Sequence, residues 1–101
     1  MNASGLEFLL ELQQTIDDRR NATTEQSYTA KLFAAGPSRI AQKVGEEGVE
    51  VAIAAVQGDQ PRLRAEAADL LYHLIVLLRI HDLSLEEVVG ELAQRRRSPD
   101  S

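Results

Sequence analysis

The sequence contains no cysteine and no tryptophan, and two Tyr and two Phe are its only aromatic residues. Without thiolates the chain cannot form a disulfide scaffold, a thiolate zinc site or an iron–sulfur site. Few aromatic rings leave few platforms on which single-stranded nucleic acid could stack. The absence of cysteine also fits a reducing compartment, and the first residues lack the basic start of a signal peptide. We therefore expect a cytoplasmic protein.

Positive charge is in the minority, with 11 Lys and Arg against 16 Asp and Glu and a formal net charge of −5. This balance opposes general binding to a phosphate backbone, although a local basic patch could hold a small anion. Uncharged apolar runs stay well short of the roughly 18 residues that a membrane span needs. We expect neither a nucleic-acid partner nor a membrane partner.

Proline and glycine are also few, at three and six residues, and the stretches between them carry apolar residues at helical spacing. The pattern predicts one all-α domain over residues 1–101, with a tail that frays from about residue 95. The expected helices are 4–20, 27–35, 37–57, 60 to 80 or 81, and one that starts after residue 84. Expected caps are Ser4 with Glu7, Gly36, Gly58 with Asp59, and Ser84 with Glu87.

The two longest predicted helices are joined at Gly58 and should form an antiparallel hairpin. Residues equally far from Gly58 then lie at the same height on facing helices. Glu47 and Asp69 form one such pair, and Glu50 and Glu66 form another. Residues three apart share a helical face. The sequence therefore predicts a two-by-two array of four carboxylates between the helices.

Apolar residues surround both long helices, as Ile40, Val44, Val49, Val51, Ile53 and Val56 illustrate for the first of them. Such helices are normally buried, and one short chain cannot cover both, so we expect a helical bundle completed by a dimer. Clustered carboxylates in a partly dry site repel unless a cation joins them. Oxygen ligands alone favour a hard ion, Mg²⁺ or Mn²⁺, over zinc, which suggests metal-assisted attack on a phosphoanhydride.

Lys43 and His73 extend the facing polar stripes by one turn. Lys43 could hold a phosphate or only neutralise Glu47, and His73 could contact phosphate, shuttle a proton or be a satisfied core histidine. Glu46 could lie at the edge of the array or pair with a base. The acidic pattern itself could be a solvated helix face. A second set of alternatives concerns Gly45 and Gly48, which either admit a ligand or partner helix or reflect tight packing.

Two segments carry a family resemblance. Glu46-Glu47-Gly48-Val49-Glu50 with Glu66-Ala67-Ala68-Asp69 resembles the EExxE…ExxD signature of the MazG-like all-α nucleotide pyrophosphohydrolases. More narrowly, the chain is similar to the phosphoribosyl-ATP pyrophosphatase family of histidine biosynthesis. The motifs that carry this similarity are residues 27–33, Gly36, Lys43-Val44-Gly45 and residues 68–74. The similarity extends from Leu6 to about Arg96. One departure is Gly48, where relatives more often carry Ala.

The resemblance implies hydrolysis of phosphoribosyl-ATP between its α- and β-phosphates, with Mg²⁺, by a homodimer with interleaved helices. It implies three sets of site residues. The metal ligands would be Glu47, Glu50, Glu66 and Asp69. The catalytic carboxylates would be Glu46, Glu47 and Glu50, with the general base undecided. The substrate contacts would be Ser27, Tyr28, Thr29, Lys31, Lys43 and His73.

Two other functions fit the same residues. A housecleaning pyrophosphatase of the same superfamily would act on (d)NTPs, and a helical interaction module would carry the acids only for solubility. In some organisms this activity is fused to a zinc-dependent cyclohydrolase. Because 101 residues without cysteine leave no room for that partner, we expect a stand-alone enzyme here. Arg95, Arg96 and Arg97 could bind phosphates or a subunit, or form a solvated helix end.

Overall fold

The structure is a computed structural model that describes residues 3–96, with side chains from Gly5 onward. Its helices are α1 (Ala3–Arg19), α2 (Tyr28–Ala35), α3 (Pro37–Gln57), α4 (Gln60–Ile80) and α5 (Leu85–Arg95). All regular secondary structure in this range is helical, which confirms the all-α prediction. α1 begins at Ala3, one residue before the predicted start. The predicted capping box of Ser4 and most of the predicted tail lie outside the described side chains.

Helix caps, all of them predicted except the one at Ser27, explain where the chain turns. The Ser27 hydroxyl accepts a hydrogen bond from the Ala30 amide, and the Asp59 carboxylate accepts one from the Arg62 amide, each at 3.1 Å. Gly58 has a φ of 70° and so provides the left-handed residue that ends α3. Ser84 and Glu87 form the reciprocal capping box that starts α5. These caps fix the hairpin hinge and the start of α2 where the sequence placed them.

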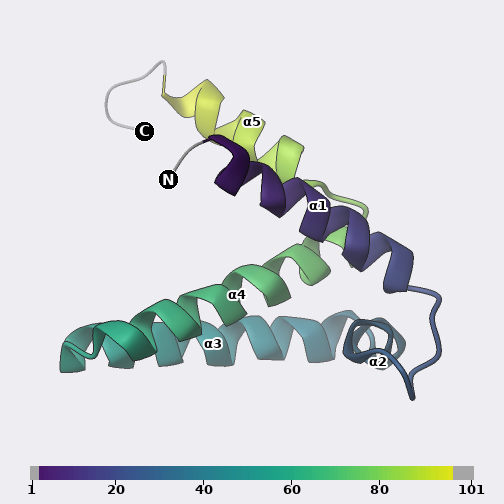
Figure 1. Cartoon of the computed structure of the whole chain (residues 1–101), viewed down its shortest axis with the longest axis horizontal. Coiled ribbons are helices and arrows are strands. Elements are labelled where there is room, and N and C mark those ends of the chain that lie inside the picture. The colour runs from purple at the N-terminus through teal and green to yellow at the C-terminus, as the bar shows by residue number, and fades with distance from the viewer. Residues whose placement is uncertain (1–2, 97–101) are drawn as a thin grey trace.

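The antiparallel pair of α3 and α4 forms the longest part of the molecule, and its Gly58 end extends away from the other helices (Figure 1). At the opposite end α2 packs against both helices, and α1 crosses the carboxyl-terminal part of α4. The core lies where these four helices meet. It consists of Ile16, Leu32, Ile40, Ile75 and Val76.

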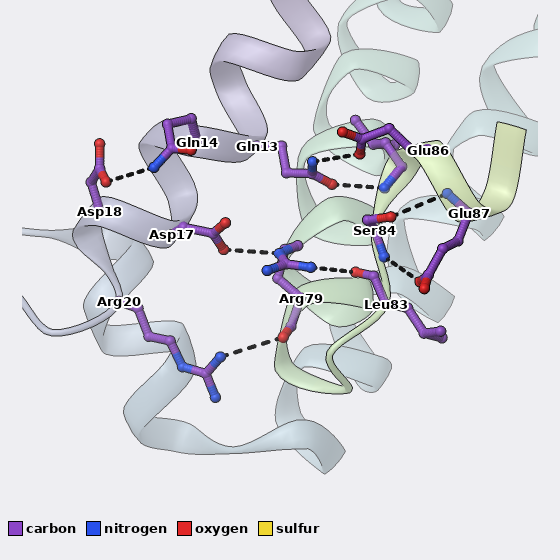
Figure 2. A network of polar contacts seen from close by, with 11 residues as sticks. Gln13, Gln14, Asp17, Asp18, Arg20, Arg79, Leu83, Ser84, Glu86 and Glu87 are labelled. Atoms are coloured by element: carbon purple, nitrogen blue, oxygen red, sulfur yellow. Dashed lines mark hydrogen bonds and ion pairs between the residues drawn. The ribbon is translucent and has the colours of Figure 1, made fainter.

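A polar network ties α1 to the turn between α4 and α5 (Figure 2). The Arg79 guanidinium donates to Asp17 at 2.9 Å and to the Leu83 carbonyl at 3.0 Å. The buried Gln13 side chain accepts from the Leu85 amide at 2.7 Å and donates to Glu86 at 2.9 Å. Because Gln13 satisfies a helix-start amide, it sets the position of α5 relative to α1.

The single chain does not bury all apolar residues of its long helices. On α3, Val49 is 59% exposed, Ile53 is 40% exposed and Val56 is 88% exposed. One chain therefore leaves this face of α3 uncovered, which agrees with the expectation that a single short chain cannot cover both long helices. A second uncovered region is an apolar groove of about 700 Å³ between α1 and α5, which Leu6, Leu10 and Val89 help to line. None of the helices described within residues 3–96 is both long and apolar enough to cross a membrane.

Candidate active site

Three of the four predicted carboxylates converge between α3 and α4. Oxygens of Glu47, Glu66 and Asp69 lie within 4.8 Å of one another. Glu47 and Glu66 are half-buried, while Asp69 is exposed at the edge of the site. The convergence follows from the hairpin, because a tight turn at Gly58 sets Glu47 opposite Asp69.

The fourth carboxylate, Glu50, lies beside this cluster and has a different partner. Its Oε2 atom is 2.8 Å from Nη2 of Arg62, and Nη1 of the same guanidinium donates to the Gln57 side chain at 3.1 Å. Arg62 was not among the candidates from the sequence. Its position one turn before Glu66 on α4 was the available signal, since residues four apart share a helical face.

Glu50 and Glu66 share a hydrogen bond, and their pKa values move in opposite directions. The Arg62 guanidinium and the hydrogen bond from Glu66 lower the pKa of Glu50. The hydrogen bond to Glu50 raises the pKa of Glu66, and partial burial and the charges of Glu50 and Glu47 raise it further. Of the two carboxyl groups, Glu66 is therefore the one that takes up a proton more readily, which is the expected outcome when two carboxylates compete.

His73 is buried and uses both ring nitrogens. Its Nδ1 atom lies 3.0 Å from Oε1 of Glu47 and 2.9 Å from the Asp69 carbonyl oxygen. Its Nε2 atom lies 2.9 Å from the Tyr28 hydroxyl. The predicted facing register of Lys43 and His73 therefore brings no contact between these two side chains, since Glu47 and Tyr28 occupy the ring nitrogens.

The predicted substrate segment at the start of α2 packs against α4. Tyr28 is 49% exposed, and its ring stacks on Tyr72 with centroids 6.1 Å apart. Burial of its polar end and the charge of Glu47 raise the pKa of Tyr28, so its hydroxyl stays protonated at neutral pH. Ser27 and Thr29 are buried, and the Thr29 hydroxyl bonds the Tyr72 hydroxyl. Tyr72 lies within the family motif of residues 68–74, but the sequence predicted no role for it.

The remaining predicted residues surround the cluster. Lys43 is half-buried on α3, and Lys31 is exposed on α2; neither forms an ion pair with any described residue. Neutralisation of Glu47 by Lys43 is thus not observed. Glu46 is exposed and accepts a hydrogen bond from Gln42 at 3.0 Å, which places it outside the three-carboxylate cluster.

The glycines next to the acids are not explained by packing within the chain. A Cβ atom added at Gly45 or Gly48 would meet no described atom within 4 Å. Tight intrachain packing is therefore excluded for the described residues. Approach of a ligand or a partner helix stays as the other explanation.

The cluster fits a hard divalent cation. Oxygens bound to one Mg²⁺ at about 2.1 Å lie up to about 4.2 Å apart, so small side-chain rotations would bring three oxygens now within 4.8 Å onto one ion. The donor set is oxygen only, which disfavours zinc and copper. Glu50 could join this set if it left Arg62.

A half-buried carboxylate cluster on an antiparallel helix pair defines a helical protein with a candidate site for divalent-metal and phosphate chemistry. The profile of one family, phosphoribosyl-ATP pyrophosphohydrolase, matches residues 9–96. The chain belongs to the phosphoribosyl-ATP pyrophosphohydrolase family, a family of hydrolases that the sequence resemblance had indicated.

Curated relatives support the same assignment. A histidine biosynthesis bifunctional protein HisIE from Photobacterium profundum is 56% identical over 90 residues, which are 89% of this chain and 44% of that protein. HisIE from Yersinia pestis is 53% identical over 93 residues, which are 92% of this chain and 46% of that protein. The chain thus spans about half the length of these relatives. The expectation of a stand-alone enzyme stays a prediction.

Proposed function

We propose that this chain hydrolyses phosphoribosyl-ATP to phosphoribosyl-AMP and pyrophosphate in histidine biosynthesis, and that the reaction depends on Mg²⁺, with Mn²⁺ able to replace it. The observation that carries the proposal is the convergence of Glu47, Glu66 and Asp69 in a chain of this family. On an acidic helix face that only solubilises the protein, carboxylates from two helices are expected to stay apart in solvent, because neighbouring negative charges repel each other. The substrate is an ATP derivative, and we place the reaction in the cytoplasm, where ATP is abundant.

In the proposed site, Glu47, Glu66 and Asp69 would hold the cation, and Glu50 would be a fourth ligand if it left Arg62. The bound cation supplies neutralisation of phosphate charge and a lowered pKa of water. Water attacks the α-phosphorus, and the bond between the α-phosphorus and the oxygen that bridges it to the β-phosphorus breaks. Pyrophosphate leaves with the electron pair of that bond. A carboxylate takes the proton that water loses.

We propose that one of the three carboxylates Glu46, Glu47 and Glu50 accepts the proton that the attacking water loses. Glu46 is the exposed member, so it can reach a water molecule outside the cluster. Glu47 is held by His73 and Glu50 by Arg62. This difference favours Glu46 for the orientation of water, with Glu47 and Glu50 acting through the cation.

Lys43 and Lys31 are proposed to contact the substrate phosphates, since neither has an acidic partner among the described residues. Tyr28 offers a half-exposed ring and hydroxyl beside the cluster. Ser27 and Thr29 are buried in hydrogen bonds, so we propose that these two shape the segment that presents Tyr28.

A homodimer with interleaved helices is proposed to cover the exposed apolar residues of α3. A charged residue at a buried interface position is expected to dissociate it, because an unpaired charge is costly to bury. Ile53→Glu should therefore give a monomer in light scattering, while Thr24→Glu, on the polar connection before α2, should leave the dimer intact. A native chain that is monomeric at micromolar concentration would contradict this assembly.

The test of the activity is pyrophosphate release from phosphoribosyl-ATP by the native chain, with Mg²⁺ and with excess EDTA. We expect turnover that requires the metal and that exceeds turnover of dCTP or dUTP. Faster hydrolysis of the two deoxynucleotides would support the housecleaning alternative. No release from any of the three nucleotides would overturn the proposed function.

A further inference from the structure

His73 links a predicted metal ligand to the segment that is proposed to meet the substrate. The ring belongs to α4, is only 6% exposed, and lies between Glu47 of α3 and Tyr28 of α2. It is therefore held from three helices at once. No solvent-facing ring nitrogen is left for a phosphate oxygen.

The contacts indicate which atoms donate when the ring is neutral. Nδ1 faces two acceptors, the Glu47 carboxylate at 3.0 Å and the Asp69 carbonyl at 2.9 Å, so it must carry a hydrogen. In the neutral imidazole, which has a single N–H, Nε2 is then an acceptor, and the Tyr28 hydroxyl is assigned as its donor. The hydrogen bonds thus run in one direction, from Tyr28 through His73 to Glu47.

We infer that His73 is a positioning residue that holds Glu47 in its metal-binding orientation and connects it, through Tyr28, to α2. The inference rests on the proposed function of Glu47 as a metal ligand, and it replaces a direct phosphate contact by His73. Groups that orient a metal ligand commonly change metal affinity by about 10- to 100-fold when they are removed. The same range is expected here.

A second hydroxyl contact between α2 and α4 provides a matched control. The Tyr72 hydroxyl bonds Thr29, just as the Tyr28 hydroxyl bonds His73, but it forms no hydrogen bond with His73 or with a described carboxylate. The Tyr72 ring contacts the His73 ring with centroids 5.1 Å apart, and a phenylalanine keeps that ring. Loss of either tyrosine hydroxyl removes one link between the same two helices. Only the Tyr28 hydroxyl is part of the chain of hydrogen bonds that reaches Glu47.

The experiment measures Mn²⁺ binding by titration calorimetry, without nucleotide, for the native chain and four variants. His73→Gln removes the donor at the Nδ1 position and should weaken binding about 10- to 100-fold. His73→Asn places an amide N–H near that position and should keep the affinity within about threefold. Tyr28→Phe should weaken binding by a factor of about 2 to 5, and Tyr72→Phe should leave it unchanged.

Kinetics separates positioning from direct substrate contact. In the His73→Gln variant, the Mg²⁺ concentration for half-maximal activity should rise, while KM for phosphoribosyl-ATP at saturating Mg²⁺ stays near the native value. A raised KM with native Mn²⁺ affinity would overturn the inference. Equal Mn²⁺ affinity of the Tyr28→Phe and Tyr72→Phe variants would also overturn it, and this comparison remains if both His73 variants fail to fold.

Failure of the inference and failure of the proposed function can be told apart. Native hydrolysis with unaltered Mn²⁺ affinity in the folded His73→Gln variant would reject the positioning role and leave the function standing. The predicted affinity changes in a chain that hydrolyses no phosphoribosyl-ATP would support the positioning role and reject the function. A native chain that binds no Mn²⁺ would reject both.

Discussion

Arg62 holds Glu50 by a contact of 2.8 Å between Nη2 and Oε2, next to the cluster that Glu47, Glu66 and Asp69 form. The fourth acid of the array, Glu50, is thereby paired with a positively charged side chain of the protein itself. A metal ion that recruits Glu50 must compete with this guanidinium. The relation between these two residues should therefore tune metal affinity.

Replacement of Arg62 by Gln should tighten Mn²⁺ binding by a factor of about 2 to 10, because the competing charge near the site is removed. Titration calorimetry at low salt measures the change. Arg64→Gln is the matched control, since Arg64 is exposed on the same helix and forms no ion pair with any described residue. Weaker binding by the Arg62→Gln variant would show that Arg62 supports the cluster.

The raised pKa of Glu66 predicts how the metal-free chain responds to pH. The folded state keeps the Glu66 proton at pH values where the unfolded chain has lost it, so this group makes stability fall as pH rises from about its ordinary value of 4.5. The Glu66→Gln variant lacks this pH-dependent fall in stability, because its amide does not ionise. The stability of this variant relative to the native chain should therefore increase with pH and then level off.

Urea unfolding in EDTA between about pH 4 and pH 8 measures this difference. Glu25→Gln, in the connection between α1 and α2, is the control for removal of one negative charge. Glu50 has the opposite effect on stability. Its pKa is lowered in the folded state, so its contribution to the stability of the fold is lost as pH falls. Because Glu66 contributes to the lowered pKa of Glu50, the difference between the Glu66→Gln variant and the native chain measures the two carboxylates together. A difference that does not vary with pH would contradict the prediction.

Asp69→Asn should separate stability from activity. The neutral amide relieves repulsion in the cluster, so the unfolding temperature in EDTA should hold or rise. Loss of a charged ligand should lower pyrophosphate release by about 100-fold or more and remove most of the thermal stabilisation that Mg²⁺ confers. Calorimetry with and without Mg²⁺, next to the activity assay, tests both parts. Loss of metal-free stability together with activity would instead identify a structural role.

Gly48→Ala tests the explanation of the helical glycine. With no described atom within 4 Å of an added Cβ, the methyl group should stabilise α3 by about 0.5–1 kcal/mol through helix propensity. Activity should be retained, unless a ligand or partner helix approaches Gly48. Gly58→Ala is the contrasting variant, because its φ of 70° should make the same change destabilising by about 1 kcal/mol or more. Urea unfolding and the pyrophosphate assay measure both.

Local signals in the sequence placed the helices closely. The caps at Ser27, Gly58, Asp59 and Ser84 are formed by residues whose side chain or backbone freedom favours a helix end, whatever surrounds them. The register of Glu47 with Asp69 followed from the hinge, since helical rise is constant on both sides of a tight turn. These features depend on near neighbours along the chain.

The sequence by itself determined the helices, their hinge and the pairing of acids across it, because helix periodicity and capping are local properties. Only the tertiary structure decided that Arg62 takes Glu50, that His73 turns to Glu47 and Tyr28, and that one face of α3 lies uncovered. Those outcomes depend on which side chains meet from α2, α3 and α4. Such meetings depend on how helices cross in space, which the spacing of residues within each helix does not determine.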